Sequence, residues 1–373
     1  MRVRLEDVCE KESSKLKQSD VINQNGLYPV YGASGYLGNI NTYQQSNYYI
    51  AVVKDGAGIG RTMLLPPESS IIGTMQYLIP KDNVLPEYLY YVVKAKHLEK
   101  YFSGATIPHI YFKDYKNEQF DLVSFDEQRE IINRLKKIEI IIDNLSKNLL
   151  LLDELVRARF VEMFGDPVLN DKSWQVIKLG ELCSKICSGN TPKGGSDNYK
   201  KEGIMFFRSQ NVWKNRLELD DIVYIDEATH ERMKETSLNY GDILITKTGR
   251  INTENSSLGR SALFLGKNDS ANINGHVYLV RINSELVNRN FVLQILISPQ
   301  YRDLIRRVCV GGIDKRQLNQ NHIYDFPIIV PPLELQNQFA SFVEEIDKSR
   351  SRIQKSLEAS QELFDSLMQE YFG

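Results

Sequence analysis

Two loops combine basic side chains with a glycine-bearing turn, and each follows a strand-like segment. The first runs from Lys54 through several glycines to Arg61. The second begins at Lys247, contains Arg250 and ends at Arg260. Lysine and arginine bind phosphate oxygens, and a glycine turn lets the backbone approach a polyanion closely. Both loops are therefore candidates for nucleic-acid contacts, although a plain hairpin turn explains the same pattern equally well.

Two further basic groups lie in the second half of the chain, one interleaved with aromatic residues and the other around Gly311-Gly312. They contribute the DNA-binding candidates Lys193, Arg208, Gln210, Lys214, Lys315 and Arg316. Lysine and arginine can also read guanine, and glutamine can read adenine. Beside the second group, Arg302 and Arg306 are four residues apart and share one face of an expected helix. A charge run is often only a solvated face, so the candidates depend on their clustering.

Motifs for catalysis or metal binding are absent from the sequence. It contains no phosphate-binding loop, no H-E-x-x-H, no nucleophile elbow and no motif for methylating a base amino group. The four cysteines form no metal-ligand spacing, which indicates reduced thiols in a cytoplasmic protein. Neither a signal peptide nor an apolar run of membrane-spanning length is evident. We expect no catalytic residue, metal or cofactor in this chain. Because the net charge is −2, any DNA-binding charge must gather on one face.

The sequence contains an internal repeat. Val3–Cys9 matches Ile177–Cys183, and Val52–Gly56 matches Ile245–Gly249. Each copy predicts a mixed α+β globule with short β-branched strands and one amphipathic helix. The expected strands are Tyr48–Val53, Ile71–Ile79, Phe120–Val123, Gly241–Thr246, Val277–Ile282 and Phe326–Val330, and the expected helices are Glu87–Lys96 and Asn290–Ser298.

Each copy ends in a long amphipathic helix, and the two helices align without an insertion when Gln128 is matched to Gln336. Their apolar residues alternate steps of four and three, the period of a coiled coil. The spacer positions are Ile131, Leu135, Ile138, Leu149, Val343, Ile346, Ile353 and Leu357. A helix of about 36 residues is roughly 54 Å long. We expect the two helices to pair antiparallel within one chain, with Ile131 facing Tyr371. Dimerisation with a second molecule is the alternative.

The chain resembles the DNA-specificity subunits of type I restriction–modification systems. The resemblance covers essentially the whole chain and depends on Lys178–Leu182, Gly241–Leu244, Gly104–His109 and Val330–Gln338. The first copy departs from the family at Val123–Gln128, where it keeps the glutamine and lacks both prolines. The resemblance implies two target recognition domains, residues 1–124 and 167–332. It also implies two antiparallel coiled-coil helices, residues 125–166 and 333–373, related by a pseudo-twofold repeat.

The same resemblance implies a function without catalysis. Each target recognition domain would bind one half of a bipartite double-stranded DNA site, and the helices would set the gap between the halves. Two methyltransferase subunits, which use S-adenosylmethionine, would dock on this chain, and restriction subunits can join them. The competing reading is a coiled-coil scaffold with two domains that bind carbohydrate or protein. Salt-dependent DNA binding would separate the two, because phosphate contacts impose a steep salt dependence. A stand-alone enzyme is the third class.

Overall fold

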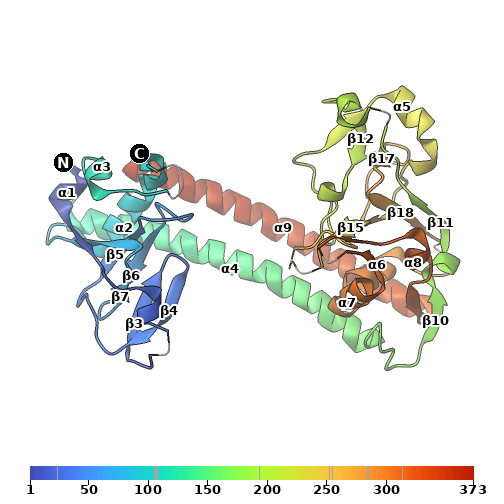
Figure 1. The fold of residues 1–373 in the computed structure, drawn as a ribbon, viewed down its shortest axis with the longest axis horizontal. Helices are drawn as coiled ribbons and strands as arrows, with labels where there is room; N and C mark the ends of the chain where they lie inside the picture. The colour runs from blue at the N-terminus through green and yellow to red at the C-terminus, as the bar shows by residue number, and fades with distance from the viewer. Residues whose placement is uncertain are drawn as a thin grey trace. The chain divides into compact units, whose positions relative to one another are not determined.

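In the computed structural model, the chain folds as two units that divide both long helices between them. Unit 1 comprises Met1–Asn148 and Ile353–Gly373, and unit 2 comprises Leu149–Arg352. The expected domains kept each helix as a separate segment, whereas each unit contains part of both helices. The structure describes residues 1–22, 24–104, 108–192, 194–251, 253, 255–283, 285–312 and 314–373. Figure 1 labels the α-helices and many of the strands and colours the chain from its N-terminus to its C-terminus.

Unit 1 is built on a sheet of order β2-β8-β5-β6, in which all neighbouring strands are antiparallel. A second sheet has the order β4-β3-β7, and β1 pairs with β9. The strands are β1 (Arg2–Arg4), β2 (Cys9–Ser13), β3 (Tyr28–Gly32), β4 (Gly35–Ile40), β5 (Tyr49–Val53), β6 (Thr62–Leu65), β7 (Ser70–Ile71), β8 (Met75–Pro80) and β9 (Gln119–Asp121). The helices that complete the globule are α1 (Leu5–Val8), α2 (Pro86–Ala95) and α3 (Phe112–Tyr115). All five residues of β5 are buried, since this strand is covered on both faces.

Unit 2 repeats the same strand order with a different sequence. Its sheets are β11-β18-β14-β16, β13-β12-β17, the pair β10-β21 and the small sheet β15-β20-β19. The strands are β10 (Gln175–Lys178), β11 (Cys183–Ser188), β12 (Ile204–Phe207), β13 (Val223–Ile225), β14 (Ile243–Thr246), β15 (Thr248–Gly249), β16 (Ser261–Leu263), β17 (Ala271–Ile273), β18 (Val277–Ile282), β19 (Val310–Gly311), β20 (Arg316–Gln317) and β21 (Pro327–Val330). The helices are α5 (Glu227–Arg232), α6 (Arg289–Ile297), α7 (Pro299–Val308) and α8 (Gln320–Tyr324). The parallel pair β3-β7 of unit 1 recurs as β12-β17, so the repeat extends to strand direction.

One expected strand was wrong in extent. Ile71–Ile79 is two strands, β7 and β8, because the chain turns between them and the Gly73 N–H donates to Leu16 O at 2.7 Å. A Cβ at Gly73 would lie 3.3 Å from Ser14 O, so the close approach of the backbones favours glycine there. The expected strand Phe120–Val123 agrees to within two residues at each end with β9, Gln119–Asp121. The other expected strands and helices agree with the structure to within two residues at each end.

The long helices are α4 (Phe125–Phe164) and α9 (Leu333–Phe372), close to the expected 125–166 and 333–373. They begin by different means. Pro331-Pro332 precedes α9, whereas Ser124 and Glu127 begin α4 with reciprocal side-chain contacts: the Ser124 N–H donates to Glu127 Oε2 at 3.0 Å. Such a capping box satisfies backbone donors that a helix start leaves free. The first copy therefore compensates for its missing prolines with a polar cap.

Within each unit, the start of one long helix packs against the end of the other. In unit 1, Leu135 shares an apolar core with Phe364 and Phe372. In unit 2, the rings of Phe160 and Phe339 are 5.4 Å apart. Of the predicted spacer residues, Leu135, Ile138, Val343 and Ile346 are buried, while Ile131, Leu149, Ile353 and Leu357 are half-buried. The half-buried positions beyond the globules, Leu149, Ile353 and Leu357, belong to none of the apolar cores of the described residues.

A buried glutamine attaches each long helix to its globule. In unit 1, Gln128 Oε1 accepts from the Leu85 N–H at 2.8 Å, and its Nε2 donates to Val123 O at 3.0 Å. In unit 2, Gln336 Oε1 accepts from the Asn288 N–H at 2.9 Å, and its Nε2 donates to Pro331 O at 2.8 Å. Leu85 and Asn288 are the N-caps of α2 and α6.

These contacts connect three elements through one amide in each unit. The glutamine on the first turn of the long helix bonds both the preceding chain segment and the start of the amphipathic helix. Both amides are almost fully buried, with Gln128 1% and Gln336 0% exposed. A buried amide needs partners for its donor and acceptor, because an unpaired buried polar group costs free energy. The glutamine therefore fixes how each helix leaves its own globule.

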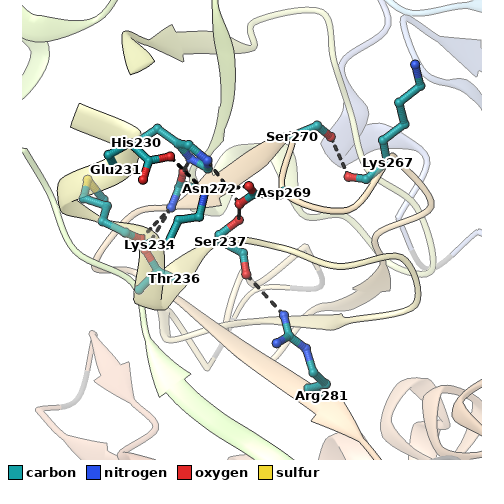
Figure 2. Close-up of polar contacts among 11 residues, drawn as sticks. His230, Glu231, Lys234, Thr236, Ser237, Lys267, Asp269, Ser270, Asn272 and Arg281 are labelled. Atoms are coloured by element: carbon teal, nitrogen blue, oxygen red, sulfur yellow. Dashed lines mark hydrogen bonds and ion pairs between the residues drawn. The ribbon is translucent and has the colours of Figure 1, made fainter. Parts of the chain in front are cut away.

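A polar network secures the second sheet of unit 2 (Figure 2). His230, from α5, has both ring nitrogens beside oxygen atoms, Nδ1 at Asn272 Oδ1 and Nε2 at Asp269 Oδ1, the latter 3.2 Å away. Because Asn272 Nδ2 donates to Met233 O at 2.9 Å, its oxygen is the atom that faces His230. Hydrogen bonds from Lys234 and Ser237 lower the pKa of Asp269 to about 2. The network thus joins α5 to β17 through polar contacts.

We expect Gln336→Met to lower the free energy of unfolding of unit 2 by about 2–3 kcal/mol. The substitution keeps the side-chain volume but leaves the Asn288 N–H and Pro331 O without their partner. Both tryptophans, Trp174 and Trp213, lie in unit 2, so fluorescence during urea unfolding reports on that unit.

Gln338→Met is the matched control, since Gln338 is exposed on the same helix. It should leave the urea midpoint within the error of the wild-type value. Equal stability of the two variants would show that the buried amide does not hold the helix.

Candidate nucleic-acid interface

A small antiparallel ribbon in unit 2 gathers four of the predicted DNA-binding residues. β20 pairs with both β15 and β19, so that Arg316 lies beside Gly249 on one side and Gly311 on the other. Lys247 directly precedes β15, and Leu318 N–H donates to its carbonyl at 2.8 Å. The ribbon candidates are Lys247, Arg250, Lys315 and Arg316. Arg250 and Lys315 are exposed, so the ribbon presents positive charge to solvent.

Unit 1 has an equivalent ribbon with different chemistry. Its bridges join Asp55 to His109 and His109 to Ser103, and Ile110 N–H donates to Lys54 O at 2.9 Å. Lys54 thus occupies the place that Lys247 occupies in unit 2. At the position that Gln317 holds in unit 2, unit 1 carries His109, whose Nδ1 lies 2.7 Å from Asp55 Oδ1. The ring of His109 stacks on the exposed Tyr111 at 6.4 Å. Residues 105–107, in the motif between Gly104 and His109, lie outside the described residues.

The two ribbons therefore have one backbone frame and two sets of side chains. The unit 2 ribbon has the forked donors that suit phosphate or guanine. The unit 1 ribbon has an acid–imidazole pair and an aromatic face, which suit base edges and stacking better than phosphate. Arg61, the other candidate in unit 1, is exposed and donates through Nη1 to Ala33 O at 2.7 Å.

Arg208 and Gln210 do not join the ribbon. Arg208 Nη2 lies 3.0 Å from Asp221 Oδ2, and Gln210 Nε2 donates to the same oxygen at 3.1 Å. Asn211 Nδ2 also donates to Asp221, to its Oδ1 at 2.7 Å. One carboxylate thus organises all three side chains, and Arg208 is largely covered, with 18% of its side chain exposed. Both candidates are engaged within the protein before any ligand arrives.

Arg260 requires a correction. It was expected to contact DNA as the counterpart of Arg61, but it is only 7% exposed. Its guanidinium lies 3.7 Å from the ring centroid of Trp213, and its Nε donates to Ser256 O at 3.1 Å. Arginine stacks well on indole because the charge is delocalised over a plane. Lys214, next to Trp213, is exposed, and Lys193 lies outside the described residues.

Sequence reasoning missed two contributors to this region. Asp221 engages the side chains of Arg208 and Gln210. It lies too far from them along the sequence for a periodic pattern to indicate the contact. The Asp55–His109 pair was also missed, although aligning Asp55 with Thr248 and His109 with the β20 region indicates where it would form. A contact between two aligned loops can be found from the repeat, whereas a partner in a non-repeated loop cannot.

The described part of the chain also bears on metal, thiol and membrane roles. No group of three or more His, Cys, Asp and Glu side chains there could hold a metal ion. The four cysteines are free, and burial raises the pKa of Cys9 and Cys183 to about 12, which disfavours reactive thiolates. Within the same ranges, none of the helices is long and apolar enough to cross a membrane.

The chain is similar to known proteins over most of its length. The model of the type I restriction modification DNA specificity domain matches residues 1–151 and 171–361. The type I restriction enzyme MjaVIII specificity subunit of Methanocaldococcus jannaschii is 22% identical over 82% of this chain and 76% of its own length. The MjaIX specificity subunit of the same organism is 24% identical over 78% of this chain and 69% of its own length.

Solved structures give the same fold. The crystal structure of a type I restriction–modification S subunit from M. genitalium superposes with a TM-score of 0.64 at 16% identity, covering 100% of this chain and 96% of that one. A chain from a structural study of complex assembly and conformational transition in the type I system gives 0.56 at 16% identity, covering 100% and 97%. The family match spans both copies of the repeat, and so the chain belongs to the type I restriction modification DNA specificity family.

Proposed function

We propose that this chain is a non-catalytic subunit that recognises a bipartite double-stranded DNA sequence, with one half-site read by each unit. The observation that carries the proposal is the duplicated ribbon: one backbone arrangement, held by the carbonyls of Lys54 and Lys247, presents different side chains in the two units. A protein that reads two unlike half-sites needs a repeated frame with divergent contacts. The exposed cations of the unit 2 ribbon fit a DNA backbone, while His109 and Tyr111 in unit 1 fit base edges.

The long helices would act as the spacer between the two readers. The proposed arrangement of α4 and α9 is an antiparallel coiled coil with pseudo-twofold symmetry. It is supported by the packing of opposite helix ends in each unit and by the Arg350–Asp153 ion pair of 2.8 Å in unit 2. Two readers joined rigidly gain affinity through effective concentration only when the target spacing fits.

Exposed apolar residues on α4 favour a partner protein. Leu151 and Leu155 are 57% and 46% exposed, and they are four residues apart on one helix face. Exposed leucines on a long helix are typical of a helix-in-groove or helix-on-helix interface. We propose that methyltransferase subunits dock here and bring S-adenosylmethionine, and that restriction subunits can join the complex in the cytoplasm.

Removing the exposed ribbon cations should weaken DNA binding irrespective of sequence. For Arg250→Gln combined with Lys315→Gln, we expect at least about a tenfold loss of affinity and a salt slope smaller by about two, because each cation releases about one counterion. Fluorescence anisotropy with duplex DNA across a salt series measures both quantities.

The matched control is Lys267→Gln with Lys348→Gln, two exposed lysines of unit 2 away from the ribbon. It removes the same charge and should change the slope less. If the DNA affinity of the wild-type chain does not depend on salt, the result would favour a coiled-coil scaffold and would contradict the proposed recognition of DNA.

Lengthening the spacer should change the gap and leave both half-sites alone. Seven residues added to α4 after Asn148 and seven to α9 after Arg352 extend each helix by about 10.5 Å, or about three base pairs. Selection from random duplexes measures preferred half-sites and spacing together. Altered half-sites at an unchanged spacing would refute the proposed role of the helices.

Replacing both Leu151 and Leu155 with serine should weaken association with the methyltransferase by at least about tenfold, or 1.4 kcal/mol. The fold should be unaffected, since both side chains are exposed. Leu219→Ser with Leu286→Ser is the control, as these leucines are 52% and 48% exposed elsewhere in unit 2. Co-purification and titration calorimetry measure the effect, and equal affinities for the two pairs of variants would exclude this helix face.

A further inference from the structure

Four arginines lie on α7 or beside it in unit 2. Arg302 and Arg306 are one turn apart on this helix, and Arg316 donates through Nη1 to Cys309 O, at the end of the same helix, at 3.5 Å. Arg302 reaches the loop that contains Arg260, because a Cβ at Gly259 would lie 3.2 Å from its Nη1. The four side chains come from three segments that are distant in sequence, so the cluster is a product of the fold.

The cluster has little negative charge of its own. Arg306 Nη1 pairs with Asp303 Oδ1 at 2.9 Å, and that carboxylate is 66% exposed. Among the residues that the structure describes, Arg260, Arg302 and Arg316 form no ion pair. Burial, followed by the charges of Arg306 and Arg260, lowers the pKa of Arg302 to about 10. An arginine whose pKa falls lies in a place that disfavours its charge.

Three nitrogens in the cluster also lack acceptors. Arg302 Nη1, Arg306 Nε and Arg316 Nε are buried without a hydrogen-bond partner in the described structure. A buried donor without an acceptor is destabilising, and like charges placed together add to that effect. The Arg306 side chain is still 40% exposed, so the cluster is open to solvent on one side.

The fold does not require these arginines. In unit 1 the segment that corresponds to α7 is the short 3-10 helix Leu98–Tyr101, and its Lys100 is paired with Glu118 at 2.6 Å. The same strand order therefore forms in unit 1 with a neutralised lysine in this region. A cluster that costs stability and that the fold can omit is best explained by a ligand that supplies the missing acceptors.

We propose that Arg302 and Arg306 bind one phosphate group, a tetrahedral oxyanion with several acceptor oxygens. Guanidinium forks match phosphate oxygens in pairs, and an excess of positive charge favours a multiply charged oxyanion over a single carboxylate. The source is either a phosphodiester of bound DNA, which rests on the proposed function, or free phosphate. The site adjoins the unit 2 ribbon through Arg316, so a DNA backbone that reaches the ribbon can also reach α7.

Thermal unfolding of the full chain, followed by tryptophan fluorescence, tests the site without DNA. At constant ionic strength, replacing chloride with inorganic phosphate should raise the wild-type midpoint by about 3 °C and then saturate. Arg302→Gln and Arg306→Gln should each abolish this shift. Arg307→Gln, an exposed neighbour on the same helix with the same charge change, should keep it.

Stability in chloride separates a binding site from a structural one. Arg302→Gln should unfold at the wild-type midpoint or above it, because it removes a charge that its neighbours repel. A lower midpoint would show that the chain itself supplies a counterion, and it would overturn the proposal. A wild-type chain that shows no saturable phosphate shift would overturn it as well.

DNA binding then identifies the source of the phosphate. If it is the DNA backbone, Arg306→Gln should lose about tenfold in affinity for every duplex and lower the salt slope by about one relative to Arg307→Gln. Unchanged DNA binding together with a lost phosphate shift would identify free phosphate as the ligand. If phosphate raises the unfolding midpoint of a wild-type chain that binds no DNA, the proposed function would be contradicted while the phosphate site would still be supported.

Discussion

The rest of each unit depends on one buried amide on the first turn of its long helix. A helix that follows a globule through a short segment is free to pivot unless a contact fixes its first turn. Gln128 and Gln336 provide that contact with hydrogen bonds to backbone atoms on both sides, and backbone atoms are present whatever the neighbouring side chains are. The surrounding sequence can therefore diverge while the helix keeps its direction relative to its own globule.

The two ribbons follow the same principle. The carbonyls of Lys54 and Lys247 accept equivalent N–H donors, so backbone hydrogen bonds set the path of both loops. The side chains are then free to differ, with His109 where unit 2 has Gln317. A frame made of backbone contacts and a surface made of side chains lets two copies of one fold recognise different ligands.

The sequence predicted most of the frame and little of the site. The repeat, the long helices and most strands could be predicted because periodicity and a constant offset report on burial, which acts on many residues at once. Gly73 interrupts an apolar run that looks continuous, since only the approach of Leu16 reveals the turn. Arg208 and Arg260 resemble free cations in the sequence, yet Asp221 holds one and Trp213 covers the other. A charge that is satisfied by a distant partner leaves no local pattern, so composition overstates the available positive surface.

Net charge is equally uninformative about where a polyanion binds. Many of the cations here are neutralised locally, as Lys100 is by Glu118 and Arg350 is by Asp153. What distinguishes the region of α7 and the ribbon is the scarcity of such partners among the described residues, combined with burial that makes each unpaired charge more costly. A chain with a net charge of −2 can therefore present a strongly positive site, because the field near a surface depends on which charges remain unpaired and how deeply they lie.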